Sequence, residues 1–445
     1  MNAVLPLPSP SCPLSAAPPA LPRAPRTIAD TGLAQDQLSD LCARFLLRRG
    51  RSKLRALAEL IKLPPSVVGE VVAFLRGERL IELFGHAGIE SDAEYQLTDA
   101  GRRFAWEAFT RNQYTGPAPV ALDVYCKSVQ AHSLRHVGVD AAFVRKAFQG
   151  VVLPPLVIDQ MGAAMNSGRP ILVFGPAGSG KTFLAEHLAA IQPGQIAVPY
   201  AITVGGEIIQ MFDPLIHQRV EAEGKPAAGL VRADLDDRWQ MCLRPVVISG
   251  GELTLQMLDL QFDAATRYYQ APPHLKANGG VFVVDDLGRQ LVSPRDLMNR
   301  WIVPLDRNQD YLSLHTGFKF AVPFDMTVIF STNLQPKDIA DEAFLRRFGY
   351  KVYLGPMDRA SYRRVFEGAC RALDVAFDAD GFDWLIEHRH QAQGRSLLAC
   401  YPRDLIGRVR DFANYEGLEA AATSKALERA WETYFNTAGA VAGRD

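Results

Sequence analysis

The sequence has few cysteines, no long apolar run and almost no net charge. Its six cysteines are spread over 445 residues without a C-x-x-C pair, which argues against structural zinc and disulfides and favours a reducing cytoplasm. No stretch approaches the roughly 18 consecutive apolar residues of a membrane span, so we expect no membrane contact. Lys and Arg number 48 and Asp and Glu 49, so no overall field favours nucleic acid or an anionic membrane.

The composition is that of an ordinary globular chain. Apolar residues make up 48% and charged residues 22%, and the length suits about three domains at roughly 150 residues each. The N-terminus is the exception, because eight prolines fall between Pro6 and Pro25. Proline fixes φ and removes a backbone donor, so we predict a disordered tail over residues 1–32.

Residues 33–112 carry three helical patterns, two strand-like runs and a closing helix. The apolar spacing predicts helices from Leu33 to the residue before Gly50, over Lys53–Ile61 and over Pro65–Gly77, strands over Leu80–Phe84 and Tyr95–Leu97 with a loop between them, and a helix from Thr98 to Asn112. This order resembles a winged helix-turn-helix domain, in which the third helix enters the DNA major groove.

The residues favour a protein contact or packing over DNA binding for this domain. The third helix offers one cation, Arg76, and no Asn, Gln or Lys that could contact base edges. The charges over Asp36–Asn112 nearly cancel. One basic patch keeps DNA binding as an alternative, although such a patch also suits a solvated turn between helices. It comprises Arg48, Arg49, Arg51, Lys53 and Arg55.

Residues 113–139 begin with a Pro/Gly-rich segment and are predicted to be a linker. Beyond them the apolar run Ile171–Phe174 leads into a G-x-x-x-x-G-K-[ST] motif followed by a helical pattern, the setting that a phosphate-binding P-loop requires. The motif consists of Gly175, Pro176, Ala177, Gly178, Ser179, Gly180, Lys181 and Thr182. Its backbone N–H groups would cradle phosphates, Lys181 would reach the β- and γ-phosphates, and Thr182 would ligate Mg²⁺. The motif therefore predicts ATP binding.

Two further apolar runs end in polar residues. Val281–Val284 precedes Asp285, a candidate for the magnesium shell, and Asp286, a candidate for polarising the attacking water. The other run, Met326–Phe330, precedes Asn333, which could orient that water or touch the γ-phosphate. Helix capping is the alternative interpretation of both sites.

With these motifs in order, residues 140–436 resemble the AAA+ ATPases. The resemblance implies an α/β fold with a P-loop parallel-sheet core over residues 140–356 and a helical lid over 357–445, after the winged helix. It also implies an arginine finger that serves the neighbouring subunit, with Arg347 the first choice and Arg346 the second. Arg403 matches the sensor 2 position in the lid.

The sequence departs from the family in two ways. Asp286 stands where Glu is usual, so hydrolysis could be slow. The 104 residues from Lys181 to Asp285 leave room for insertions, with Tyr200–Val220 and Gly250–Tyr269 as candidates. Insertions in this region contact the client in MoxR-like branches, and Leu312–Phe320, before Asn333, could be the hairpin that such branches carry. Each of the three segments could equally be a packed loop.

The resemblance favours a cytoplasmic, Mg²⁺-dependent ATPase that works as a homo-oligomeric ring, a hexamer, and remodels an unknown protein client, with the winged helix recruiting client or DNA. A DNA-binding regulator of the initiator or helicase-loader kind, with ATP as a slow switch, is the alternative. A scaffold in which ATP is only structural is the third interpretation.

Overall fold

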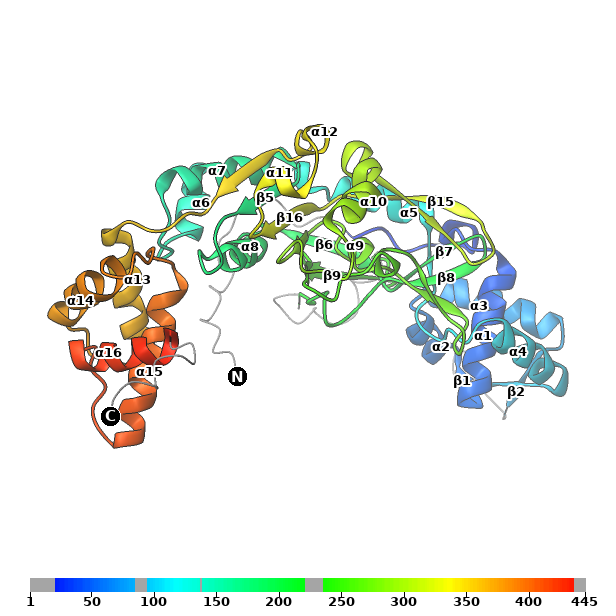
Figure 1. Cartoon of the computed structure of the whole chain (residues 1–445). Coiled ribbons are helices and arrows are strands. Elements are labelled where there is room, and N and C mark those ends of the chain that lie inside the picture. Colours follow the sequence, from blue (N-terminus) through cyan, green and yellow to red (C-terminus); the bar gives the residue numbers. More distant parts are fainter. Residues whose placement is uncertain (1–20, 85–93, 137, 221–234, 436–445) are drawn as a thin grey trace. The chain divides into compact units, whose positions relative to one another are not determined.

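The computed structural model describes residues 21–84, 94–136, 138–220 and 235–435 (Figure 1). The chain forms two compact units. One comprises Met1–Gly138, Ala189–Val284 and Gln290–Val328, and the other Val139–Leu188, Asp285–Arg289 and Ile329–Asp445. Within the described ranges, no helix is both long and apolar enough to span a membrane.

The first unit includes the four helices and two strands predicted for residues 33–112. They are α1 (Gln35–Arg49), α2 (Leu54–Ile61), α3 (Pro65–Gly77), β2 (Ile81–Phe84), β3 (Glu94–Leu97) and α4 (Asp99–Arg111). Two further elements are η1 (Ala29–Thr31) and β1 (Arg51–Lys53). The three strands pair antiparallel in the order β1-β3-β2. Strand β1 was not predicted and takes up part of the basic patch. The predicted loop between β2 and β3 lies outside the described residues.

Residues 21–32 of the predicted tail and the predicted linker contain folded structure, while residues 1–20 of that tail lie outside the described residues. Thr31 is buried, and its carbonyl accepts a 3.0 Å hydrogen bond from the buried Arg238 guanidinium. Residues 113–139 contain β4 (Val120–Ala121), α5 (Leu122–Ala131) and η3 (Leu134–His136). Tyr114 and Tyr125 of this segment are buried. Helix α5 agrees with the helical pattern that follows Pro119, whereas the prolines and glycines before it obscured apolar residues that pack into a core.

A second sheet, in the order β11-β12-β8-β7-β4, belongs to the same unit. Its surroundings include an antiparallel β6–β9 pair and an antiparallel β14–β15 hairpin. The elements are β6 (Gln195–Pro199), β7 (Ala201–Val204), β8 (Glu207–Gln210), β9 (Trp239–Leu243), η4 (Gln256–Leu258), β11 (Gln261–Asp263), β12 (Tyr268–Gln270), α9 (Pro273–Lys276), α10 (Pro294–Arg307), β14 (Gln309–Ser313) and β15 (Lys319–Pro323).

The predicted insertions are packed layers of this unit. Gly205 and Gly206, with φ of 56° and 85°, form the two-residue turn between β7 and β8. Ala201 and Ile208 of this hairpin join the core of the N-terminal helices. Ile202 packs in another core that also contains Leu312 of β14. Each hairpin therefore buries apolar residues in a core of this unit.

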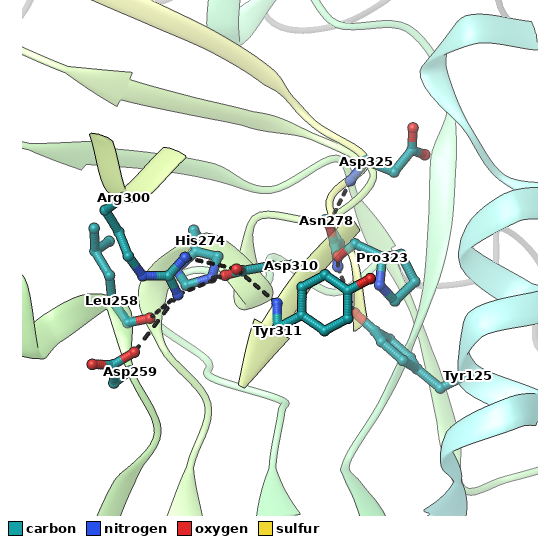
Figure 2. A network of polar contacts seen from close by, with 10 residues as sticks. All are labelled: Tyr125, Leu258, Asp259, His274, Asn278, Arg300, Asp310, Tyr311, Pro323 and Asp325. Atoms are coloured by element: carbon teal, nitrogen blue, oxygen red, sulfur yellow. Dashed lines mark hydrogen bonds and ion pairs between the residues drawn. The ribbon is translucent and has the colours of Figure 1, made fainter. Parts of the chain in front are cut away.

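Buried polar contacts fix the β14–β15 hairpin (Figure 2). Asp310 of β14 accepts hydrogen bonds of 2.7 and 2.9 Å from Arg300 and lies 2.9 Å from His274 Nε2. Burial opposes ionisation of Asp310, but the hydrogen bonds from His274 and Arg300 keep its pKa below the usual value. Asn278, just before β13, donates to the Pro323 carbonyl over 2.9 Å and to the Tyr125 hydroxyl over 3.0 Å.

The central sheet is parallel and has the strand order β10-β13-β16-β5-β17. Its strands are β5 (Ile171–Phe174), β10 (Val246–Ser249), β13 (Val281–Val284), β16 (Thr327–Thr332) and β17 (Tyr350–Tyr353). All residues of β13 and β16 are buried, as expected where both faces of a parallel sheet are covered. The predicted α/β fold class is confirmed.

In the second unit, two helices come before β5 along the chain and the others come after it. They are α6 (Ala141–Ala147), α7 (Pro155–Ser167), α8 (Lys181–Ala190), α11 (Pro336–Ile339), α12 (Glu342–Leu345), α13 (Arg359–Ala372), α14 (Ala379–Leu385), the π-helix η5 (Ile386–Gln391), α15 (Cys400–Glu416) and α16 (Ser424–Phe435). From α13 onward the helices share a core that includes Tyr362, Phe382, Leu405 and Trp431.

Candidate nucleotide site

The loop between β5 and α8 has a backbone that only glycine adopts readily. Gly175, Gly178 and Gly180 have φ of 151°, 80° and 95°. A Cβ at Gly175 would lie 2.0 Å from the Leu354 carbonyl oxygen, and one at Gly178 would lie 2.4 Å from the Cys400 sulfur. The loop opens α8, whose first-turn N–H groups have no partner within the helix and carry its positive dipole end. Neighbouring parts of the chain thus leave no room for side chains at Gly175 and Gly178, and the loop combines these glycines with a helix N-terminus, so its residues fit a nucleotide phosphate.

Lys181 links the loop to the end of β16. Its side chain is buried, and Nζ donates hydrogen bonds of 2.7 Å to Asn333 Oδ1 and 2.8 Å to the Pro176 carbonyl. Burial lowers the pKa of Lys181, while the charges of Asp286 and Asp285 act in the opposite direction. The ammonium group is therefore held inside the loop by acceptors that a phosphate could replace.

Thr182 and Asp285 form a pair of oxygen ligands. The Thr182 hydroxyl donates to the two Asp285 carboxylate oxygens over 2.9 and 3.0 Å. Magnesium prefers such oxygens and keeps several waters and substrate phosphates as its other ligands. The part of the chain that the structure describes has no group of three or more His, Cys, Asp or Glu suited to a metal. The pair therefore fits Mg²⁺ that arrives with a nucleotide rather than a protein-caged metal.

Asn333 also contacts Asp286. Its Nδ2 donates to Asp286 Oδ1 over 3.3 Å, so the single amide joins Lys181 to Asp286. Asp286 has a φ of 51°, in the left-handed region that Asp tolerates better than most residues. The two loops are tied by a 2.7 Å bond from the Leu287 N–H to the Ser331 carbonyl. Both side chains are thus held at the carboxyl ends of β13 and β16, where α/β sheets bind ligands.

The predicted arginines lie at two places in the second unit, one at the end of α12 and the other in α15. Arg346 and Arg347 follow α12, where exposed Arg346 pairs with Glu342 at 3.4 Å and the Arg347 guanidinium lies 5.7 Å from the Phe344 ring centre. Arg403 is exposed in the first turn of α15. The structure thus brings together Lys181, Thr182, Asp285, Asp286 and Asn333, whereas the contacts of Arg346 are with its own helix.

Sequence reasoning missed Cys400. The Cys400 N–H donates a 3.0 Å hydrogen bond to the Gly178 carbonyl. Cys400 belongs to no sequence motif. The one signal that could have pointed to it is its place in the sequence, about one helical turn before Arg403 of the predicted sensor 2 segment.

The comparisons with known proteins give one family match and several structural matches. Residues 358–433 match a family described as a domain of unknown function (DUF8689). No curated protein matches the chain.

Two of the matching solved structures come from bacteria. One is NtrX from Brucella abortus in complex with ADP, with 14% identity, a TM-score of 0.38, and coverage of 64% of this chain and 56% of that chain. Another is the Thermotoga maritima RuvB Holliday junction branch migration motor, with 14% identity, a TM-score of 0.39, and coverage of 65% of this chain and 73% of that one. The chain thus spans little more than half of that NtrX chain.

Proposed function

We propose that the protein is a Mg²⁺-dependent ATPase of the AAA+ type. The observation that carries the proposal is the convergence of Lys181, Thr182, Asp285, Asp286 and Asn333 at one edge of a parallel sheet, beside a loop shaped by three glycines with positive φ. Structural helix capping, the alternative for the acidic pair and for Asn333, does not account for Lys181 being buried between Asn333 and the loop.

The loop residues bind and orient the triphosphate. Backbone N–H groups of Gly175–Thr182 surround the phosphates, and Lys181 exchanges Asn333 and Pro176 for phosphate oxygens. Thr182 and Asp285 would hold Mg²⁺, which would supply positive charge to the phosphate oxygens during phosphoryl transfer.

Asp286 and Asn333 act on the attacking water. The Asp286 carboxylate accepts its proton, and the Asn333 amide orients it once Lys181 has turned to the phosphates. Their 3.3 Å contact keeps the base and the orienting amide together. The Asp286 side chain is one methylene shorter than the Glu usual in AAA+ ATPases, so its carboxylate lies farther from the attacking water and we expect slow turnover.

Arginines complete the site in the proposal. The turn after α12, where Arg346 is exposed and Arg347 is half-buried, supplies the finger presented to the nucleotide of a neighbouring subunit in a hexameric ring, with Arg347 preferred over Arg346. Arg403, on the helix whose first residue contacts the P-loop, serves as sensor 2. Such a ring would work in the cytoplasm on a protein client.

The N-terminal domain, proposed to be a winged helix, recruits that client. Glu70, Phe74 and a single cation, Arg76, are exposed on α3, so this helix offers little positive charge to a DNA backbone. The DNA-binding switch remains the second candidate because Arg48, Arg49 and Arg55 are exposed. Neutralising these three arginines should abolish salt-dependent binding of duplex DNA, measured by fluorescence anisotropy, if that candidate is correct. If the wild-type chain shows no such binding, the client function is favoured.

Steady-state ATP hydrolysis tests the core of the proposal. Lys181→Ala should lower turnover by about 10²-fold or more, since it removes a cation from the transferred phosphate. The exposed Lys425→Ala is the matched control and should behave as wild type. Hydrolysis that survives Lys181→Ala unchanged would remove the P-loop assignment, and tight ATP binding without hydrolysis would favour the scaffold interpretation.

A further inference from the structure

A short segment of the second unit lies directly on the P-loop. It consists of Leu397–Cys400, called the strap below, and leads into α15. At one end the Leu397 carbonyl accepts a 2.8 Å hydrogen bond from the Met357 N–H, and at the other the Cys400 N–H donates 3.0 Å to the Gly178 carbonyl. The strap thus connects the start of the C-terminal helices to the middle of the phosphate-binding loop.

Side chains of the strap set how closely it approaches. A Cβ added at Gly178 would lie 2.4 Å from the Cys400 sulfur, 3.4 Å from its Cβ and 3.9 Å from Leu398 Cδ1. A Cβ at Gly180 would lie 3.7 Å from the Ala399 Cβ. Cys400 is therefore in van der Waals contact with the bare Cα of Gly178, at a distance that a larger side chain could not keep.

The hydrogen bond fixes one peptide group of the loop. The Gly178 carbonyl and the Ser179 N–H belong to the same planar peptide and point in opposite directions. Because Cys400 holds the carbonyl, it determines where that N–H points, and the Ser179 N–H now donates 3.3 Å to the Pro176 carbonyl. The same carbonyl accepts from Lys181 Nζ. Movement of the strap would therefore turn a donor of the phosphate cradle.

The thiol is suited to packing rather than to reaction. Burial, with a further contribution from the charge of Asp404, raises the pKa of Cys400, so the neutral form is favoured near neutral pH. A neutral thiol behaves as a small apolar group. The size of this side chain therefore determines how closely the strap approaches Gly178.

We propose that Cys400 is a positioning residue, which orients the Gly178–Ser179 peptide and thereby makes nucleotide affinity depend on the position of the strap and α15. This inference rests on the proposed function, since it concerns the same loop. It goes further by assigning affinity control to a residue that belongs to none of the sequence motifs. A side chain larger than Cys at position 400 pushes the strap away and weakens phosphate binding, while one of similar size does not.

The test compares Cys400→Leu with Cys400→Ser and Cys400→Ala. We expect Cys400→Leu to weaken ADP binding, measured by isothermal titration, by about tenfold or more, because small displacements of binding groups are costly. It should raise KM for ATP by a similar factor and change kcat by less than about threefold. Cys400→Ser and Cys400→Ala should stay within about threefold of wild type. Cys126→Leu, at a half-buried cysteine of the other unit, is the matched control.

A labelling experiment on the wild-type chain covers the case in which Cys400→Leu does not fold. Magnesium-ADP should slow N-ethylmaleimide labelling of Cys400 about tenfold or more, read by peptide mass spectrometry, and leave Cys126 unchanged. Equal ADP affinity of Cys400→Leu and wild type, or Cys400 labelling that is indifferent to bound ADP, overturns the inference and leaves the proposed function standing. A wild-type chain that binds no nucleotide overturns both.

Discussion

Lys181 and Asn333 are joined by a 2.7 Å hydrogen bond from the ammonium group to the side-chain oxygen. The same amide donates to Asp286 over 3.3 Å. The cation proposed to bind the phosphates therefore contacts the amide proposed to orient the water. In the proposed function, phosphate oxygens compete with Asn333 for Lys181.

Replacing Asn333 should separate binding from chemistry. Asn333→Ala removes a competing acceptor of Lys181, so ADP affinity should stay the same or rise. It also removes the amide that orients water, so kcat should fall by about 10²-fold. Titration calorimetry and steady-state hydrolysis measure the two effects. A large loss of ADP affinity with unchanged kcat would contradict this role.

The left-handed backbone of Asp286 predicts that Glu, usual in the AAA+ ATPases that the sequence resembles, does not fit here. Asp tolerates φ of 51° better than Glu does, so Asp286→Glu should cost about 1 kcal/mol of stability and should not raise turnover. Asp286→Asn keeps the backbone preference and should leave the unfolding temperature unchanged while turnover falls by about 10²-fold. Faster hydrolysis by Asp286→Glu would show that the carboxylate is merely too short.

The arginine finger predicts complementation between two inactive variants. Lys181→Ala has an intact Arg347 and Arg347→Ala has an intact P-loop, so each should hydrolyse ATP at about 10⁻² of the wild-type rate or less. Mixing them should restore part of the activity if Arg347 serves a neighbouring subunit. Arg364→Ala, at an exposed arginine of α13, is the control and should hydrolyse ATP as the wild type does. A mixture no more active than its components would argue for a finger other than Arg347 or for no ring.

The buried His390 predicts an acid-sensitive C-terminal helical region. Burial lowers the pKa of His390 to about 4 from 6.5, despite a hydrogen bond to the Arg395 carbonyl. Between these values the unfolded chain binds a proton that the folded chain does not, so the free energy of unfolding rises with pH across this window and falls as pH decreases through it. The full effect is at most about 3 kcal/mol.

Denaturant unfolding followed by Trp fluorescence at pH 7.5 and pH 5 measures this effect, since His390 lies 4.9 Å from the Trp431 ring. His390→Gln should flatten the pH dependence. His388→Gln, an exposed His of the same π-helix, should leave it intact. An unchanged slope in His390→Gln would assign the acid sensitivity to other groups.

Local patterns were enough to predict several elements and the composition of the site. Apolar spacing placed α1, α2 and α3 within a residue or two, because each helix buries one face. The G-x-x-x-x-G-K-[ST] spacing identified the loop, since its backbone admits only glycine at several positions. The same patterns did not reveal the burial of residues such as Tyr114 and Thr31, because these residues are buried by contacts with distant parts of the chain.

What the sequence by itself determined is the set of chemical groups: a phosphate loop, two carboxylates, an amide and their order along the chain. The tertiary structure alone decided which of these groups touch. Two contacts, Lys181–Asn333 and Cys400–Gly178, join residues that are remote in sequence. The left-handed backbone of Asp286 depends on how the loops after β13 and β16 are hydrogen-bonded. Local patterns carry no information on such contacts, because they arise only when parallel strands and helices bring distant loops to one edge of the sheet.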